Sequence, residues 1–215
     1  MTLLAGLRET FADGLVYVPG YLDAAAQRIL LREIEAVIAA APLFQPRMPK
    51  TGKPFSVEMT NCGPLGWVSD RDGGYRYQAT HPETGRPWPP MPALVLKAWS
   101  ELGAYPHAPE ACLVNVYGAA AHMGLHQDKD ENDLGAPVVS LSLGESCVFR
   151  WGGTSRGGPT QSIKLASGDA VVLAGNARLA FHGVPRILPG TSGLLPGRRI
   201  NLTLRRVTAP QSMSA

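Results

Sequence analysis

The chain has 215 residues, a formal net charge of +3, a pI of about 8.9 and 45% hydrophobic residues, which together indicate a globular domain with an ordinary core. The basic balance is too mild to demand a nucleic-acid partner, and no apolar run approaches the roughly 20 residues of a membrane span. Three cysteines without paired spacing and an N-terminus unlike a secretory signal predict a cytoplasmic protein that does not bind membranes.

The first half of the chain predicts one strand and two helices around a long irregular segment. Residues 14–18 are apolar and predict a short strand, and Asp23 suits the N-cap of an amphipathic helix over 24–41. A second helix is predicted over about 92–103. Between the helices, residues 42–91 are crowded with Pro, Gly, aromatic and basic residues. Because a long irregular segment inside a compact domain is functional or disordered, and aromatic residues argue against disorder, this segment is predicted to be a lid.

The second half of the chain predicts a series of short strands separated by Gly-rich turns. Eight strands at this spacing are typical of a jelly roll, with the two helices packed outside. We therefore expect a mainly β (α+β) fold in one domain, 1–215, with an N-terminal lid over 42–91 and a catalytic core over 112–206. The predicted strands are 112–117, 125–128, 138–143, 146–151, 161–165, 169–174, 179–183 and 199–206.

A metal site is suggested by His126-Gln127-Asp128 and the distant His182. Residues two apart on a strand point to the same side, so His126 and Asp128 are expected to reach one ion, with His182 as the third ligand. Two histidines and a carboxylate suit Fe(II) that must keep open positions. A lone histidine is more often structural, and His122 lies at a helical zinc-ligand spacing from His126. Because Gly124 intervenes and a strand follows, His122 is interpreted as a loop residue.

The strand 199–205 alternates between apolar and polar residues, and its polar side leaves two interpretations open. An alternating strand usually turns its polar side to water. The two arginines, Arg199 and Arg205, together with Asn201, could instead bind a dicarboxylate inside a barrel, since a guanidinium pairs bidentately with a carboxylate. Asn115 and Tyr117, on a common face of another strand, could orient the same ligand.

These motifs together resemble the AlkB family of Fe(II)- and 2-oxoglutarate-dependent dioxygenases. The resemblance covers about residues 14 to 206, and the combination of HQDKD with RxNLTxR is highly specific. It implies a double-stranded β-helix (jelly roll), the cofactors Fe(II), 2-oxoglutarate and O2, and oxidative demethylation of bases such as 1-methyladenine and 3-methylcytosine, which releases succinate, CO2 and formaldehyde. The matching stretches are Met59–Gly63, Leu65–Trp67, Leu113–Tyr117, Leu125–Asp130, Phe149–Gly153, Phe181–Gly183 and Arg199–Arg205.

The resemblance also implies roles for individual residues. Trp67 matches the residue that stacks on a flipped base, with His126 on the other face of that base. Asp130 matches a substrate position, although on its own it reads as part of a solvated acidic loop, 128–133. The implied iron ligands are His126, Asp128 and His182; the implied 2-oxoglutarate contacts are Asn115, Tyr117, Arg199, Asn201 and Arg205; the implied substrate residues are Met59, Trp67, Tyr75, Asp130 and Arg156.

Three departures from the family pattern concern the surroundings of the site. Gly118-Ala-Ala120 replaces a Pro-Gly turn, Ile200 replaces an aromatic residue, and Asp72-Gly-Gly-Tyr75 contains an extra glycine. These departures leave the metal site intact and leave open the register of the lid, and with it the assignment of Tyr75. The expected partner is alkylated DNA or RNA, single- or double-stranded, and the chain is expected to be a monomer without an obligate protein partner. The alternatives are a 2-oxoglutarate oxygenase acting on a protein or small molecule, and a non-enzymatic metal-binding jelly roll.

Overall fold

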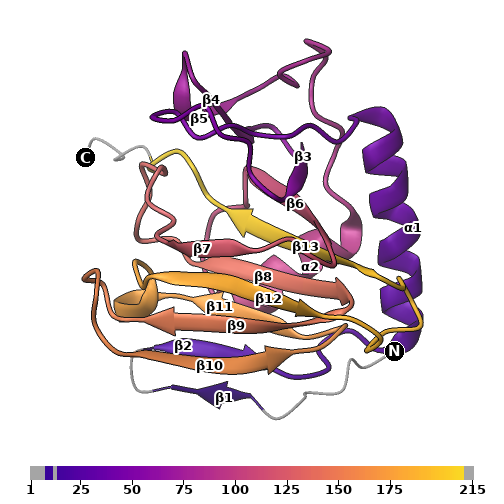
Figure 1. Cartoon of the computed structure of the whole chain (residues 1–215), viewed down its shortest axis with the longest axis vertical. Coiled ribbons are helices and arrows are strands. Elements are labelled where there is room, and N and C mark those ends of the chain that lie inside the picture. Colours follow the sequence, from indigo (N-terminus) through magenta and orange to yellow (C-terminus); the bar gives the residue numbers. More distant parts are fainter. Residues whose placement is uncertain (1–7, 12–13, 211–215) are drawn as a thin grey trace.

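A computed structural model describes residues 8–11 and 14–210. Two antiparallel sheets face each other in a jelly roll, which confirms the predicted fold (Figure 1). The seven-stranded major sheet has the order β1 (Glu9–Thr10), β2 (Leu15–Val18), β11 (Ala170–Leu173), β8 (Val138–Gly144), β13 (Arg198–Arg205), β6 (Ala111–Gly118) and β3 (Glu58–Cys62). The four-stranded minor sheet has the order β10 (Thr160–Leu165), β9 (Ser146–Gly152), β12 (His182–Leu188) and β7 (Met123–His126), and a separate hairpin joins β4 (Gly66–Asp70) to β5 (Gly74–Gln78).

Two helices cover the outer face of the major sheet, as predicted. Helix α1 (Ala24–Ala40) begins at Asp23, whose side chain accepts a hydrogen bond of 2.8 Å from the backbone N–H of Ala26. Helix α2 (Ala93–Leu102) follows Pro92. The apolar faces of both helices pack with the apolar face of β13 in one core cluster, which anchors the sheet whose opposite face lines the site.

This packing decides between the two interpretations of the polar face of β13. Ile200, Leu202 and Leu204 belong to the core beneath the helices, so the polar residues of the strand lie between the two sheets. The interpretation in which they face water is wrong, because both faces of the major sheet are covered. Each of Arg199, Asn201, Thr203 and Arg205 is at most 9% exposed.

Three expectations about local structure need correction. Strand β7 ends at His126, so Asp128 lies in the following loop and does not share a strand with His126. A 3-10 turn at Gly175–Ala177 precedes β12, which therefore begins at His182 and not at 179. The segment 42–91 is not irregular throughout, because it contains β3, β4 and β5, and β3 pairs with β6 in the major sheet.

The cysteines Cys62, Cys112 and Cys147 are buried and carry free thiols. Among the residues that the structure describes, no helix has the length and apolar character needed to cross a membrane.

Candidate active site

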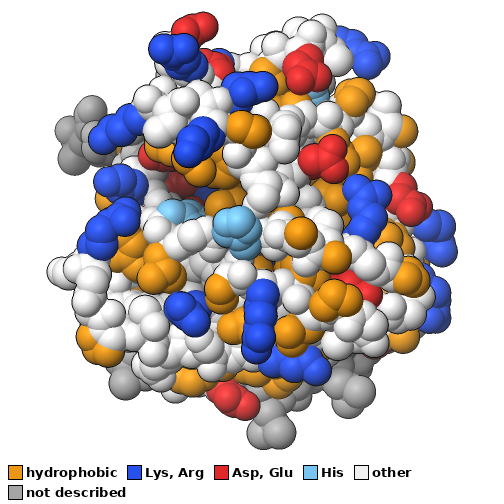
Figure 2. Space-filling view, in the orientation of Figure 1, with side chains coloured by type: hydrophobic (Ala, Val, Ile, Leu, Met, Phe, Trp, Pro, Cys, Tyr) orange, Lys and Arg blue, Asp and Glu red, His pale blue; other side chains and the backbone are white. Residues whose placement is uncertain are grey.

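A cavity of about 810 Å³ opens between the β4–β5 hairpin and the jelly roll. Its floor is formed by inward-facing residues of the major sheet, and its outer part by the end of β7, the β9–β10 turn and the hairpin. Figure 2 shows histidine side chains beside this hollow and several Lys and Arg side chains around its rim. Every residue predicted for the metal, the co-substrate and the substrate lines this one cavity: Met59, Trp67, Tyr75, Asn115, Tyr117, His126, Asp128, Asp130, Arg156, His182, Arg199, Asn201 and Arg205.

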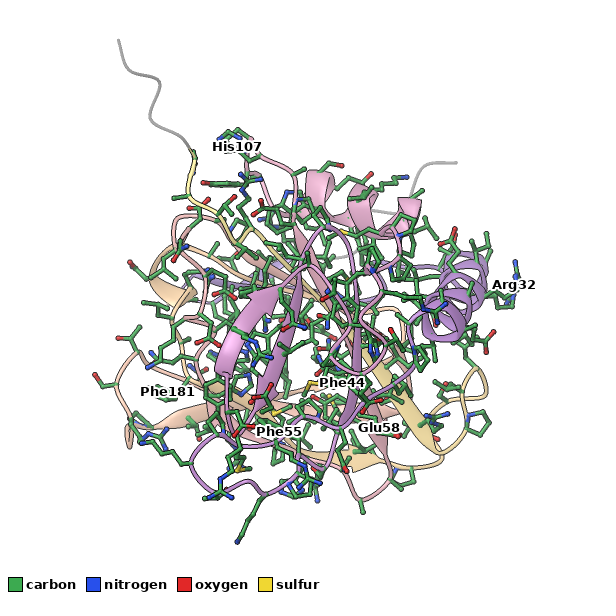
Figure 3. All side chains as sticks on the ribbon, turned by 90° about the horizontal axis from the view of Figure 1, so that it is seen from above. Arg32, Phe44, Phe55, Glu58, His107 and Phe181 are labelled. Carbon is green, nitrogen blue, oxygen red and sulfur yellow. The ribbon has the colours of Figure 1, made fainter. Side chains whose placement is uncertain are left out.

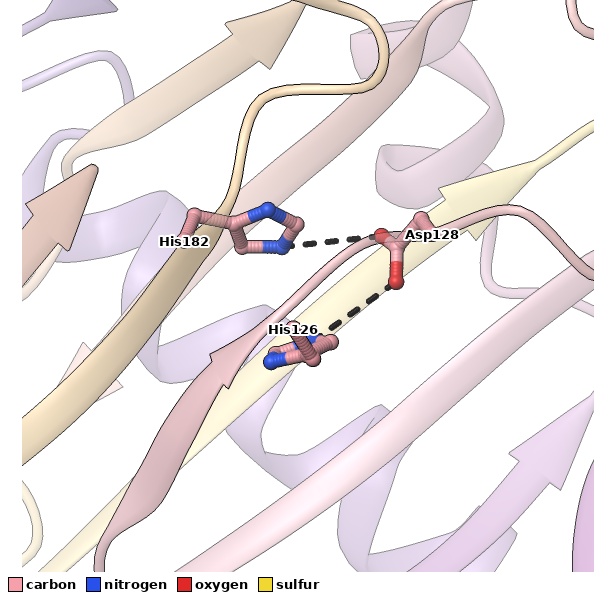
Figure 4. Close-up of side chains that lie close together, drawn as sticks. All are labelled: His126, Asp128 and His182. Carbon is pink, nitrogen blue, oxygen red and sulfur yellow. Dashed lines mark ion pairs between the residues drawn. The ribbon is translucent and has the colours of Figure 1, made fainter. Parts of the chain in front are cut away.

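His126, Asp128 and His182 converge at the centre of the cavity (Figure 4). The Nε2 atoms of His126 and His182 each lie 3.7 Å from a different oxygen of Asp128. Potential ligand atoms of all three residues lie within 4.8 Å of one another, which suits a shared metal ion. The convergence arises because His182 and His126 are register partners at the paired ends of β12 and β7, while the loop after β7 returns Asp128 towards them.

Backbone hydrogen bonds set the tautomer of both histidines. The Nδ1–H of His126 donates to the carbonyl of Gly124 at 2.9 Å, and that of His182 donates to the carbonyl of Ala180 at 3.0 Å. Because a carbonyl can only accept, Nδ1 of each ring carries the hydrogen, and Nε2 is the atom that can bind a metal. Burial, followed by the nearby His126, lowers the pKa of His182 to about 4, so this ring is neutral and able to bind a metal at neutral pH.

Asp128 is ionised and has one oxygen without a partner. Burial alone would raise the pKa of its carboxyl, but the Arg205 guanidinium and the two histidines outweigh burial and hold the pKa well below its usual range. Oδ1 accepts a hydrogen bond of 2.8 Å from Nη2 of Arg205. Oδ2 is buried and, within the described part of the chain, has no hydrogen-bond donor. A buried carboxylate whose two oxygens each face an imidazole nitrogen, one of them without a donor, is unfavourable without a cation, so the donor set fits Fe(II).

Arg199 is the second charged group that lacks a full set of partners. Its side chain is almost completely buried, and only Nη2 is hydrogen-bonded, to Ser142 Oγ at 2.9 Å. Among the described residues, Nε and Nη1 of Arg199 meet no acceptor, and neither does Asn115 Oδ1 meet a donor. Leaving a buried guanidinium unpaired is costly, and a carboxylate is its natural bidentate partner. The floor of the cavity therefore fits one end of a dicarboxylate such as 2-oxoglutarate.

Two other predicted co-substrate residues, Tyr117 and Asn201, differ in whether their hydrogen-bonding groups are already used within the fold. Burial raises the pKa of Tyr117 to about 12, so its hydroxyl remains a donor, and its ring lies 5.3 Å from the Arg199 guanidinium carbon. Asn201 is already engaged: its amide donates to Ser140 Oγ at 2.6 Å and its carbonyl accepts from Thr203. Asn201 lines the cavity but holds the sheet together with these bonds.

Sequence reasoning missed a buried charge network beside the iron ligands. Glu131 pairs with Nη2 of Arg178 at 3.0 Å and with Nε of Arg205 at 3.4 Å, and it accepts a short hydrogen bond from the Tyr77 hydroxyl. Arg178 also donates to the backbone carbonyl of Asp128 at 2.6 Å. The 128–133 loop is therefore only partly solvated. Pattern alone could not reveal this, since Arg178 and Glu131 are 47 residues apart and each resembles an ordinary surface residue.

The hairpin forms the aromatic wall of the cavity. Trp67 donates its indole N–H to Asp130 at 2.9 Å, and the rings of Trp67 and Tyr75 stack with centroids 5.6 Å apart and an interplanar angle of 21°. Tyr75 is half exposed, whereas Met59 is buried. Arg156 lies over the ring of Phe181, and Figure 3 shows Phe181 and the lid residue Phe55 on the same side of the molecule.

The fold is a jelly roll, and its site combines two histidines, one carboxylate and a buried unpaired arginine. These features define an iron oxygenase that uses a dicarboxylate co-substrate. Comparison with known proteins agrees. Residues 14–205 match the family model of the 2OG-Fe(II) oxygenase superfamily. An alpha-ketoglutarate-dependent dioxygenase AlkB homolog of Caulobacter vibrioides is 55% identical over 198 residues, which cover 92% of this chain and 89% of the relative.

The alpha-ketoglutarate-dependent dioxygenase AlkB of Escherichia coli K12 is 40% identical over 203 residues, 93% of each chain. The solved structure of OsALKBH1 matches with a TM-score of 0.78 and 29% identity over 93% of this chain and 99% of that one. The chain therefore belongs to the AlkB family within the 2OG-Fe(II) oxygenase superfamily, as its motifs predict. It is an Fe(II)- and 2-oxoglutarate-dependent dioxygenase that consumes O2.

Proposed function

We propose that this dioxygenase repairs nucleic acid by oxidative demethylation of N-alkylated bases, with 1-methyladenine and 3-methylcytosine in DNA as substrates and RNA as a further one. The observation that carries the proposal is the aromatic wall: Trp67 shares one cavity with the metal triad and is fixed there by Asp130. An oxygenase acting on a small molecule or a protein has no need of a stacking platform at this place, whereas every base has a π-face that can stack on one.

In the proposed reaction the residues of the chain bind, orient and exclude water. His126, Asp128 and His182 would hold Fe(II), and Arg199 with Tyr117 and Asn115 would hold 2-oxoglutarate. When bound, Fe(II) with 2-oxoglutarate and O2 supplies the oxidising chemistry that converts the N-methyl group to a hydroxymethyl group, which leaves as formaldehyde. Enclosure between the two sheets keeps bulk water from the reacting groups.

The lesion itself explains the chemistry of the aromatic wall. A methyl group on N1 of adenine or N3 of cytosine blocks pairing and makes the base cationic, and flipping such a base out of the stack costs least. Trp67 offers a face with favourable cation–π character. Asp130 uses Oδ2 to hold Trp67, which leaves its other oxygen for the cationic base. Met59, Tyr75 and Arg156 complete the proposed substrate pocket.

The basic residues of the lid are not equivalent candidates for phosphate contacts. Arg76 is paired with Asp70 at 2.8 Å, and Arg47 donates to the backbone of Gly52. Lys50 of the lid is exposed and lines the cavity. Lys129 and Arg156, which lie outside the lid, are also exposed and line the cavity. These three cations are therefore proposed to contact the backbone of the substrate, and binding should weaken as salt rises.

One assay tests the proposal. The protein is incubated with Fe(II), ascorbate, 2-oxoglutarate and an oligonucleotide that carries 1-methyladenine or 3-methylcytosine, and both formaldehyde and the restored base are quantified. We expect the two products in equal amounts. Formaldehyde without lesion repair would contradict the proposal. For the co-substrate, an Arg205→Ala variant with full activity at low 2-oxoglutarate would exclude a role of Arg205 at that end of the ligand.

The biological setting is proposed on the same basis. The free thiols of Cys62, Cys112 and Cys147 support a cytoplasmic enzyme. We propose one functional domain, in which 112–206 is the catalytic core and 42–91 is the nucleotide-recognition lid, acting as a monomer without an obligate protein partner. Light scattering of the purified chain tests the monomer, and a dimeric mass would refute it.

A further inference from the structure

The loop that carries the iron ligand Asp128 is also the place where the hairpin is fastened. Two residues after Asp128, Asp130 accepts the indole N–H of Trp67 at 2.9 Å, and the next residue, Glu131, accepts the hydroxyl of Tyr77. Trp67 and Tyr77 are direct register partners on β4 and β5. One cross-strand pair of the hairpin is thus tied, by two adjacent carboxylates, to the loop that supplies the metal ligand.

Arg205 completes a path from the hairpin to the metal site. Its Nη1 donates to the Tyr77 hydroxyl at 3.2 Å, and its Nη2 donates to Asp128 Oδ1 at 2.8 Å. The side chains of Asp128, Glu131 and Arg205 are at least nine-tenths buried. Polar networks in such surroundings are stiff, since each lost bond leaves an unsatisfied group. Tyr77 is the member of this network that belongs to the hairpin, and it is uncharged.

We propose that Tyr77 is a positioning residue that links the seating of a base on the hairpin to the orientation of Asp128. This inference rests on the proposed demethylation. A base that stacks on Trp67, with His126 on its other face, contacts the ring that also stacks on Tyr75 and pairs with Tyr77 across the hairpin, so seating of the base reaches Tyr77 through this cross-strand pair. The hydrogen bond between Arg205 and the Tyr77 hydroxyl transmits this change to Arg205, which in turn holds the metal ligand Asp128. Co-substrate is then consumed productively when a base is in place.

The variant Tyr77→Phe removes the hydroxyl and keeps the ring. We expect the succinate formed per repaired base to rise several-fold, with the repair rate roughly tenfold lower, the size expected for the loss of one buried hydrogen bond that positions the metal ligand. The readout beyond activity is the visible absorption of the Fe(II)–2-oxoglutarate chelate under anaerobic conditions. Methylated oligonucleotide should shift this absorption in the wild type and leave it unchanged in the variant.

Two further variants separate positioning from mere structural loss. Tyr21→Phe removes a similar hydroxyl bond, 2.5 Å to Glu101, away from the cavity, and should keep the wild-type ratio and spectral shift. Trp67→Phe should raise KM for the oligonucleotide while the ratio stays near the wild-type value. A Tyr77→Phe enzyme with wild-type ratio and shift overturns the inference. Repair by the wild type is measured before the variants are tested. If the wild type repairs no lesion, the proposed function is wrong, and the variants do not bear on it.

A second, independent feature is the outer face of the minor sheet. The four strands β7, β9, β10 and β12 contain no Asp or Glu, and they carry three exposed cations: Arg150, Lys164 and Arg186. Lys164 and Arg186 flank Val148 on either side, and Arg150 lies two residues further along β9, so all three share one face. Among the described residues none of the three forms an ion pair. Figure 2 shows Lys and Arg side chains gathered over these strands, below the hollow of the active site.

We infer that this face binds the phosphodiester backbone of the nucleic acid whose base occupies the cavity. By strand geometry, Lys164 and Arg186 lie two strand spacings apart, about 10 Å, and Arg150 lies diagonally about 8 Å from each, so the three cations can follow one phosphodiester strand. The surface is continuous with the site, because β9 leads into the turn that carries Arg156 at the cavity. This inference also rests on the proposed function.

The test compares a long and a short substrate in the triple variant Arg150→Gln, Lys164→Gln, Arg186→Gln. For a methylated 20-nucleotide oligonucleotide, the slope of log affinity against log salt should fall by about two to three units. Repair of a methylated trinucleotide should be unchanged, which also shows that the variant is folded. The matched control is Arg28→Gln, Arg32→Gln, Lys97→Gln on the helices, where Figure 3 shows Arg32 pointing away from the body of the protein. An unchanged slope, or an equal loss in the control, overturns the inference.

Discussion

The inner and outer halves of the active-site cavity are built in opposite ways. The inner half consists of buried side chains of paired strands and of the loop after β7, and Asp128 Oδ2 and two nitrogens of Arg199 are left without partners among the described residues. The outer half consists of the hairpin residues Trp67 and Tyr75, which already satisfy one another by stacking. The inner half therefore awaits specific ligands, whereas the aromatic contacts of the outer half are complete without one. Rigid strands suit a fixed metal and co-substrate, and a hairpin suits bases of different shape.

The largest effect is expected at the metal. His126→Ala should abolish turnover, by at least about 1000-fold, because the cation and its chemistry are lost. The ring is 40% exposed, so stability should change little. His122→Ala is the matched control, since His122 is exposed and lies outside the triad. Repair is measured by formaldehyde release. If His126→Ala releases as much formaldehyde as His122→Ala does, the assignment of His126 as an iron ligand is wrong.

The next effect concerns the unpaired arginine. Arg199→Met should weaken 2-oxoglutarate roughly 100-fold, yet raise the free energy of unfolding of the ligand-free protein by about 1–4 kcal/mol, because a buried charge without a partner is removed. Adding 2-oxoglutarate should stabilise the wild type and leave the variant unchanged.

Arg198→Met, at the exposed neighbouring position, is the control for this experiment. Thermal unfolding with and without 2-oxoglutarate provides the measurement. A variant that is less stable than the wild type without ligand would show that Arg199 already has its partners within the fold.

A smaller effect is expected at the aromatic wall. Trp67→Ala should raise KM for a methylated oligonucleotide roughly 5- to 150-fold, since stacking on one base is worth about 1–3 kcal/mol. The KM for 2-oxoglutarate should stay within about twofold, because the two halves of the cavity are built from different elements. If the oligonucleotide KM stays and the 2-oxoglutarate KM rises, the division between inner and outer halves is wrong.

The smallest effect is expected at the tip of the hairpin. The ion pair of Arg76 and Asp70 is more than one-third exposed on both sides, and pairs of this kind contribute about 0–1 kcal/mol. Arg76→Ala should lower the midpoint of thermal unfolding by less than about 4 °C and change oligonucleotide affinity by less than about twofold. Lys50→Ala should reduce the salt dependence of binding more than Arg76→Ala does, because Lys50 lines the cavity. The reverse order would assign phosphate binding to the paired arginine.

Local patterns by themselves determined much of this protein. The 3.6-residue spacing of α1 and α2 and the alternation of β13 depend only on near neighbours in the chain, and both were predictable. The residue types and spacing of the motifs suggested the iron ligands and a dicarboxylate contact at Arg199, whereas Trp67 was named only through the family resemblance.

Tertiary structure alone decided which way these residues face and what they contact. The polar side of β13 lies inside because helices cover its other side, and alternation is the same for either direction. The contacts of Glu131 with Arg178 and Tyr77 join segments about 50 residues apart, and the stack of Tyr75 on Trp67 depends on the register of the hairpin. Contacts of this kind arise from packing between distant elements, to which each residue contributes without any local signature.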